Sequence, residues 1–229
     1  MRERLAAEAS MPSKVELSKV EPGKTHLCYI TDRKAFPGDE ATRRRLLLAK
    51  IAEAANAGVD YIQLREKDLC SGELEKLARE AVRIVRQGQT PTSILINSRV
   101  DIALAVGAHG VHLPANDISP REVQAIRKAA RQAPANFTIS VACHSVEDVR
   151  RAESEGANFA VLAPIFEKTA TSAIPLGLQM LKDACAGRLP IFALGGVTLE
   201  NSGTCLEAGA TGIAAIRLFQ NNNVKKVIA

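Results

Sequence analysis

The sequence predicts a single (β/α)₈ barrel, the TIM-barrel architecture of the α/β class, from three observations. The chain has 229 residues, and a barrel of this kind takes about 200–250 residues. A short pattern occurs four times, in which a glycine and neighbouring alanines precede a run of mostly apolar residues. The four copies surround Gly58, Gly107, Gly156 and Gly209. These glycines are 49, 49 and 53 residues apart, a period that suits two βα units for each repeat. Four copies therefore predict eight units.

The eight expected strands divide into four that carry the repeat and four that lie between them. The repeat strands are contained in AGVDYIQL, VGAHGVHL, EGANFAVL and AGATGIAAI. The intermediate strands are residues 25–31, 93–97, 137–143 and 190–196. Each repeat glycine is expected to end a helix, because the turn into the next strand needs a positive φ there.

Amphipathic stretches with apolar residues at helical spacing alternate with the strands, which predicts helices between them. They include residues 44–55, 74–85, 121–130, 146–152 and 176–184. The segment after Asn97 is short and leaves room for one or two helical turns. Alternating strands and helices with short links imply a parallel sheet, and eight near-equal units favour its closure. We expect the barrel to span 25–220, with a mobile or helical arm at 1–24 and a tail at 221–229.

The composition is that of a soluble globule, with 46% hydrophobic and 24% charged residues. Aromatic residues are scarce, so the core must be built from aliphatic side chains, which favours parallel strands buried on both faces. No apolar run approaches the ~18–20 residues of a membrane span, and the first 24 residues lack the apolar stretch of a signal peptide. The five cysteines form no CxxC pair, so we expect free thiols and a cytoplasmic protein.

The net charge of +5 does not indicate nucleic-acid binding. The lysines and arginines are scattered among carboxylates, and no aromatic residues accompany them. A mild basic excess does suit a pocket for phosphate esters. We therefore expect small phosphorylated substrates, and neither nucleic acid nor a membrane as a partner.

The active site of such a barrel is built at the carboxyl ends of its strands. After the first repeat strand comes Gln63-Leu64-Arg65-Glu66-Lys67, where alternation turns Gln63, Arg65 and Lys67 to one side. Two cations and an amide on one face suit the binding of a diphosphate. A solvated charged loop explains the same residues equally well.

Asp117, which follows the second repeat strand, is the best candidate ligand for a hard cation. Mg²⁺ prefers one or two carboxylates together with phosphate oxygens. Asp117 would suit equally the N-terminus of the helix that begins near Pro120. Ser119, directly before that proline, is nevertheless the stronger cap.

The later strands end in two further candidates. Cys143-His144 follows the strand at 137–143; His144 is either an acid–base group or a hydrogen-bonded structural histidine, and Cys143 is expected to be a buried, inert thiol. Gly195 and Gly196 end the strand at 190–196. With a helix N-terminus after them, they would form a backbone cradle for a phosphate, at the usual place in this fold.

These residues resemble a known family, thiamine phosphate synthase, and the related thiazole tautomerases share much of the pattern. The resemblance rests on YITDR, IQLREKDL, LINSRVDIALAVGAHGVHL, VACHS, APIF and ALGGVTLEN and covers about residues 26–220. It implies an enzyme that joins a pyrimidine methyl diphosphate to a thiazole phosphate, giving thiamine phosphate and diphosphate. Mg²⁺ and cationic side chains would hold the leaving diphosphate while a pyrimidine cation forms and the thiazole nitrogen captures it. A homodimer is compatible with this assignment.

The resemblance also implies roles for individual residues. Those that grip the diphosphate substrate would be Gln63, Arg65, Lys67 and Asn97. Asp117 would bind Mg²⁺. The thiazole phosphate would be held by Gly195, Gly196 and the backbone at Ile216 and Arg217. The catalytic set would be Arg65, Lys67, His144 and Lys168.

Three departures from the family pattern bear on activity. Ser98 stands where the family has a second metal-binding aspartate, which should weaken Mg²⁺ binding unless the substrate supplies most of the ligands. Ala142-Cys143-His144 replaces Ser-Thr-His, with the loss of a hydroxyl. The loop after APIF is shorter than the family's Thr-x-Thr-Lys loop, and the resemblance implies that Lys168 would take the place of the family's lysine.

Two alternatives follow from these departures. One is a metal-independent isomerase like the thiazole tautomerases, in which His144 moves a proton on a thiazole carboxylate phosphate. The aspartate missing at Ser98 favours it, whereas the retained Gln63 and Asp117 oppose it. The other is a barrel without catalytic activity that binds thiamine precursors or a partner protein.

Overall fold

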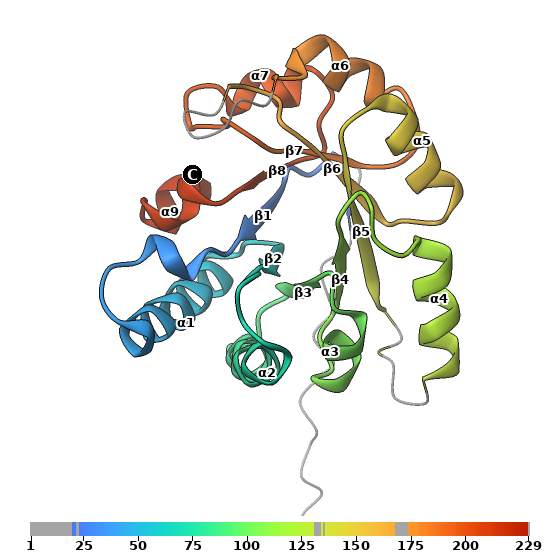
Figure 1. The fold of residues 1–229 in the computed structure, drawn as a ribbon. Helices are drawn as coiled ribbons and strands as arrows, with labels where there is room; N and C mark the ends of the chain where they lie inside the picture. The colour runs from blue at the N-terminus through green and yellow to red at the C-terminus, as the bar shows by residue number, and fades with distance from the viewer. Residues whose placement is uncertain (1–19, 22, 131–133, 135, 168–173, 229) are drawn as a thin grey trace, which may run out of the picture.

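The computed structural model describes residues 20–228 except 22, 131–133, 135 and 168–173. Most of the expected N-terminal arm, residues 1–19, lies outside the described part. Eight parallel strands form a closed barrel in chain order, with helices around it (Figure 1), so the predicted (β/α)₈ fold is confirmed. The strands are β1 (His26–Ile30), β2 (Tyr61–Leu64), β3 (Ser93–Asn97), β4 (Gly110–Leu113), β5 (Thr138–Cys143), β6 (Phe159–Leu162), β7 (Ile191–Ala193) and β8 (Gly212–Ala215).

The predicted helices are all present, with ends that differ by a few residues. They are α1 (Glu40–Ala57), α2 (Ser71–Gln87), α4 (Pro120–Ala129), α5 (Val146–Ser154) and α6 (Gly177–Ala184), and α3 (Val100–Ala105) is the expected short one. Four further elements were not singled out from the sequence: the 3₁₀ turn η1 (Arg33–Ala35), α7 (Ser202–Glu207), α8 (Arg217–Gln220) and α9 (Val224–Ile228). The segment expected as a tail thus contains α9, where the buried Val224 donates its N–H to the Glu53 carboxylate of α1 at 2.9 Å.

Local chemistry sets the helix ends. The four repeat glycines have φ values of 94°, 65°, 84° and 102°, as their predicted place at helix C-termini requires. Gly58 donates its N–H to the carbonyls of Ala54 and Ala55 at the end of α1. At the start of α4, Ser119 and Glu122 form a capping box ahead of Pro120. Ser119 is therefore the cap of this helix, as predicted.

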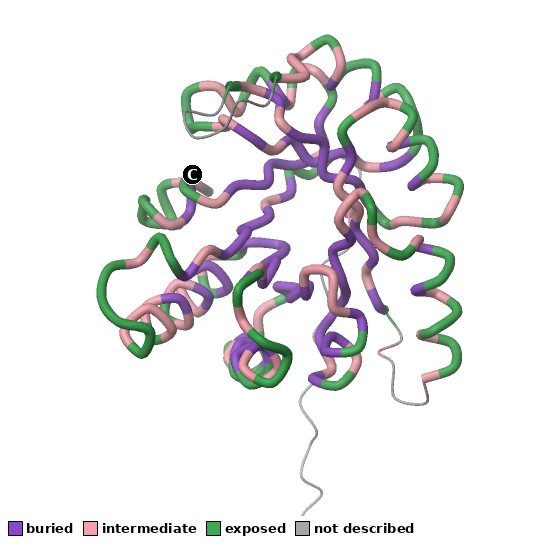
Figure 2. The backbone as a smooth tube through the Cα atoms, viewed as in Figure 1, coloured by how far each residue is buried: buried purple, intermediate pink, exposed green. Residues whose placement is uncertain are grey.

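The barrel is filled at the amino ends of its strands. Tyr61, Phe159 and Phe192 are fully or almost fully buried inside it, and the rings of Phe159 and Phe192 stack at 4.4 Å between centroids. The buried His26 stacks on Phe192 and lies 3.1 Å from the Asp60 carboxylate. Figure 2 shows the buried strands at the centre and the exposed positions on the outer faces of the helices. This packing leaves the carboxyl ends of the strands as the place for a site.

No helix in the described part of the chain is long and apolar enough to cross a membrane. All five cysteines are free thiols. Cys143 is fully buried, as predicted, and burial raises the pKa of its thiol to about 12. A thiol with such a pKa is almost never ionised near neutrality, so Cys143 is inert as a nucleophile.

Because His109 and His112 are buried, we expect the free energy of unfolding of the protein to fall in mild acid. Burial lowers the pKa of His109 and of His112 to about 4, from 6.5. The unfolded chain therefore binds more protons than the folded one between pH 6.5 and pH 4, and the free energy of unfolding falls as the pH drops through this window. Urea titrations at pH 7 and pH 5 should show a loss of about 2 kcal/mol for each histidine.

The buried Glu66 works in the opposite direction, because burial raises the pKa of its carboxyl. Variants that lack one histidine separate the contribution of the histidines to the pH dependence of stability from that of Glu66. His109→Asn and His112→Gln should each reduce the difference between the two pH values. If the pH dependence of both variants equals that of the parent protein, the histidines do not cause it.

Candidate functional site

One half of the barrel mouth is lined by polar side chains from β2 to β5. Gln63 and Asn97 lie two residues beyond Tyr61 and Leu95 of the barrel interior, so they also face inward. Gln63 is 2% exposed and donates its Nε2–H to Oδ1 of Asn97 at 2.9 Å. Its Oε1 is buried without a partner among the described residues. Such an acceptor is costly to bury unless a donor reaches it, and a bound ligand could supply that donor.

His112 belongs to the same polar half, although the sequence analysis did not select it. It is paired in register with Asn97 on one side and Ser140 on the other, and its Nδ1 lies 2.9 Å from Oγ of Ser140. Burial, and secondarily the cation of Arg65, lowers the pKa of His112, so its ring is neutral near pH 7. The signal in the sequence was a histidine at the inward position of an otherwise apolar strand.

Arg65 and Lys67 lie in the loop directly after β2. Arg65 is partly exposed and Lys67 exposed, and neither forms a salt bridge with a carboxylate in the described part of the chain. Arg65 directly follows Leu64, the last residue of β2, so its backbone lies at the carboxyl end of the strand that carries Gln63. Glu66, between the two cations, is instead buried and accepts hydrogen bonds from Thr31 and Arg33. The predicted alternation thus separates the loop's cations from its buried acid.

The structure brings together the two residues expected near a metal ion. The Oγ of Ser98 donates a hydrogen bond to Oδ2 of Asp117. Oδ1 of Asp117 accepts the Ile118 N–H at 2.8 Å. The described residues contain no group of three or more His, Cys, Asp or Glu side chains that could by themselves hold a metal ion. Any cation here would need most of its ligands from elsewhere.

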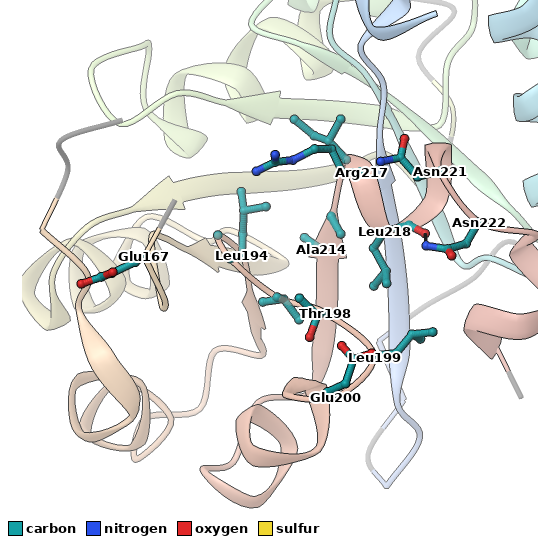
Figure 3. Close-up of a pocket in the computed structure, with 15 residues that line it drawn as sticks. Glu167, Leu194, Thr198, Leu199, Glu200, Ala214, Arg217, Leu218, Asn221 and Asn222 are labelled. Carbon is teal, nitrogen blue, oxygen red and sulfur yellow. Dashed lines mark hydrogen bonds between the residues drawn. The ribbon is translucent and has the colours of Figure 1, made fainter. Parts of the chain in front are cut away.

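A cavity of about 550 Å³ opens at the carboxyl ends of β7 and β8. It contains the predicted phosphate-binding residues Gly195, Gly196, Ile216 and Arg217 in its lining. In Figure 3, Arg217 lies at one edge of the labelled side chains and Glu200 at the other. Because Glu167 and Glu200 also line the cavity, an anion would have to be held on the glycine side, by backbone N–H groups and Arg217.

The expected helix N-terminus directly after the paired glycines is not there. A turn at residues 198–201 intervenes, in which Oδ1 of Asn201 accepts the Thr198 N–H and its Nδ2 donates to the Gly196 carbonyl. This local pairing satisfies the backbone after Gly196 and delays α7 to Ser202. The four-residue α8 begins directly after β8 instead, with Ile216 at its N-cap.

His144 lies at the surface after β5, outside the cavity lining. Its Nδ1 lies 2.7 Å from the Ala163 carbonyl, and its backbone N–H donates to the Asp148 carboxylate at 3.0 Å. With Nδ1–H donating to that carbonyl, the lone pair of Nε2 would be free to accept a proton. Lys168 lies outside the described residues.

Lys67, Asp117 and the paired glycines follow the carboxyl ends of β2, β4 and β7. All eight strands are parallel in one closed barrel, so these residues share one rim of it. The polar half of the mouth and the glycine-lined cavity therefore lie on the same rim of the barrel.

Comparisons with known proteins agree with this geometry. Residues 27–219 match the family described as thiamine monophosphate synthase. A relative from Aquifex aeolicus, named provisionally as a thiamine-phosphate synthase 2, is 40% identical over 195 residues, 84% of this chain and 96% of its own length. The thiamine-phosphate synthase of Chlorobium luteolum is 36% identical over 200 residues, 85% of each chain.

Among solved structures, the thiamine phosphate pyrophosphorylase of Pyrococcus furiosus is similar to this chain. The two superpose with a TM-score of 0.72 at 27% identity, covering 88% of this chain and 90% of the other. The likeness thus extends over almost the whole barrel.

Proposed function

The chain belongs to the thiamine monophosphate synthase family, and from this membership we propose that it is a thiamine phosphate synthase. It would condense 4-amino-2-methyl-5-hydroxymethylpyrimidine diphosphate with thiazole phosphate. The observation that carries the proposal is the presence, on one barrel rim, of two features. One is an amide-lined polar half followed by Arg65 and Lys67, which have no carboxylate partner among the described residues, and the other is a glycine-lined cavity. These two parts suit a diphosphate and a monophosphate ester, respectively.

The residues of the polar half would act on the diphosphate substrate. Gln63 and Asn97 would orient it, the buried Oε1 of Gln63 accepting a hydrogen bond from the substrate. Arg65 and Lys67 would stabilise the charge that develops on the leaving diphosphate as the C–O bond breaks. The thiazole nitrogen would then form the new C–N bond, and the diphosphate would leave with the electron pair of the broken bond.

The glycine-lined cavity would hold the second substrate. Its volume of about 550 Å³ lies within the range of small-molecule sites. Backbone N–H groups at Gly196 and Arg217, with the Arg217 guanidinium, would bind the thiazole phosphate. Holding the two reactants on one rim removes most of the entropy cost of their encounter.

The donor atoms of Asp117 and Ser98 fit one Mg²⁺ ion. A carboxylate and a hydroxyl in direct contact are oxygen donors, and Mg²⁺ characteristically takes one or two carboxylates with the remaining ligands from phosphates and water. Mg²⁺ would supply charge neutralisation on the diphosphate. Asp117 would bind the ion directly. Oxygen atoms of the substrate would supply the coordination that a second aspartate, at position 98, would otherwise provide.

The remaining assignments are proposals of the same kind. We place the catalytic barrel in residues 25–220, with 1–24 and 221–229 as accessory segments. The five free thiols favour the cytoplasm as the site of action. Small phosphorylated molecules are the proposed partners, and a homodimer is compatible with the fold.

A single assay tests the function. The protein is incubated with both substrates, with and without Mg²⁺, and thiamine phosphate is measured. Metal-dependent product formation is the expected result. Isomerisation of a thiazole carboxylate phosphate without metal would instead identify the tautomerase alternative, for which the free Nε2 of His144 is the candidate base. Binding of both substrates without either reaction would identify a binding protein.

Ser98→Asp should tighten the dependence on Mg²⁺. Ser98 has a φ of 63°, a conformation in which aspartate is better tolerated than most residues, so the backbone can keep its shape. A second carboxylate beside Asp117 should lower the Mg²⁺ concentration at half-maximal rate by about tenfold. A Mg²⁺ titration of activity, with Ser98→Asn as the uncharged control, measures this. An identical midpoint in all three proteins would show that position 98 does not contact the metal.

A further inference from the structure

Arg33 is buried in the loop after β1, surrounded by three carboxylates. Only 3% of the surface of Arg33 is exposed to solvent. Its Nε donates to Glu40 at 2.8 Å, and Nη1 donates to Glu66 at 3.1 Å. Nη1 and Nη2 also donate to the two carboxylate oxygens of Asp68, both at 2.7 Å. This is a fork-shaped, charge-assisted contact of the strong kind.

Two of these three acids belong to the loop that carries the proposed diphosphate-binding cations. In residues 65–68, cations and acids alternate: Arg65, Glu66, Lys67, Asp68. Arg33 binds both acids and contacts neither cation in the structure. Lys34 is a second partner of Asp68, with its Nζ 3.1 Å from Oδ2. With these acids bound elsewhere, Arg65 and Lys67 form no salt bridge with any residue that the structure describes.

Thr31 connects this cluster to the backbone of the loop. Its hydroxyl donates to Oε1 of Glu66 at 2.6 Å and accepts the N–H of Arg65 at 2.9 Å. The backbone N–H of Arg33 also donates to the Glu66 carboxylate, at 3.2 and 3.1 Å to its two oxygens. The backbone N–H of Arg65 is therefore linked, through the Thr31 hydroxyl and the Glu66 carboxylate, to the Arg33 guanidinium.

Stability alone does not explain such a cluster. Buried ion pairs carry a desolvation cost that often cancels their attraction, and apolar residues of similar size can replace them without loss of stability. Burial raises the pKa of the Glu66 carboxyl, although its contacts with Thr31 and Arg33 act in the opposite direction.

We propose that Arg33 is a positioning residue that neutralises Glu66 and Asp68 and orients the 65–68 loop, so that Arg65 and Lys67 face the diphosphate unpaired. The proposal rests on the proposed function and adds a residue that does not touch substrate. Without the Arg33 guanidinium, Glu66 would lose its cationic partner and Asp68 would keep only Lys34, so the loop would carry more uncompensated negative charge and bind a diphosphate less well. The loop would also be free to pair its own cations with its own acids.

Arg33→Met tests the electrostatic role, with inorganic diphosphate and Mg²⁺ as the probe in a calorimetric titration and with steady-state kinetics. We expect the Kd for diphosphate and the KM for the pyrimidine diphosphate to rise about tenfold at low salt. The KM for the thiazole phosphate should change little. Arg79→Met, which removes an exposed arginine paired with Glu75 on α2, is the matched control and should change neither constant.

A compensating variant separates this role from a purely structural one. In Arg33→Met/Glu66→Gln/Asp68→Asn the acids are neutral, so diphosphate binding should recover to near the parent value. Glu66→Gln/Asp68→Asn alone should bind diphosphate at least as tightly as the parent protein, and this variant is informative even if Arg33→Met does not fold. Failure of the triple variant to recover, or weaker binding by the double variant, would overturn the proposal. Because diphosphate binding needs no turnover, this result is independent of whether thiamine phosphate is formed.

Discussion

Lys67→Met is expected to lower kcat for thiamine phosphate formation by about 10²- to 10³-fold, the loss typical of removing one group that stabilises developing charge. Lys67 is an exposed cation without a carboxylate partner in the described structure. It lies in the same loop as Arg65, at the polar half of the barrel mouth. Methionine keeps most of the length of the side chain and removes its charge together with the N–H donors of the ammonium group.

The physical reason is that the leaving diphosphate gains charge as the C–O bond breaks. A cation that meets this charge stabilises the transition state more than the bound substrate, so its loss appears in kcat. Single-turnover kinetics with saturating Mg²⁺ would measure the chemical step directly.

Lys76→Met is the matched control for this variant. Lys76 is an exposed lysine on α2 that is paired with Glu73 and is not among the residues assigned to the proposed site. It should leave kcat unchanged. Equal rates for the parent protein and Lys67→Met would remove Lys67 from the mechanism.

Gly196→Ala is expected to raise the KM for thiazole phosphate by tenfold or more and to lower the melting temperature. Gly196 has a φ of 67°, and an added Cβ would lie 2.6 Å from the Glu167 carbonyl oxygen and 2.7 Å from Cβ of Phe166. Both distances are below any real contact of a Cβ atom. The backbone after β6 would have to move, and displacement of a positioned group by about 1 Å can cost 10²-fold in rate.

The two loops involved are bonded to each other, which explains why the effect should reach the cavity. Phe166 donates its N–H to the Gly195 carbonyl at 2.9 Å, and both Glu167 and Gly196 line the cavity. Kinetics with the thiazole phosphate varied, together with thermal unfolding, would report the two consequences separately.

Gly203→Ala provides the control for this substitution. Gly203 lies in α7 with no atom within 4 Å of an added Cβ, and alanine is favoured over glycine inside a helix. It should stabilise the protein slightly and leave the KM unaltered. A normal KM in Gly196→Ala would show that the thiazole phosphate is not bound at this loop.

The sequence by itself determined the eight strands, the six helices between β1 and β7, and the order of these elements. Alternating strands and helices are local patterns, and the repeat around Gly58, Gly107, Gly156 and Gly209 could be counted directly. Ser119 and Pro120 marked a helix start through contacts within four residues. The family resemblance assigned Gln63 and Asn97 to the binding of the diphosphate, which stays a prediction; the hydrogen bond between them is a finding of the structure.

Only the tertiary structure decided which side chains are paired and which are free. Arg33 and Asp68 are 35 residues apart and bind each other, whereas Lys67, beside Asp68, has no carboxylate partner in the part of the chain that the structure describes. His112 becomes neutral because strands on both sides bury it. The turn at 198–201 prevails over the expected helix start through the side chain of Asn201. Burial and charge pairing depend on tertiary contacts between segments that are far apart in the sequence. The periodicity of apolar residues along the chain does not say which of these segments come into contact.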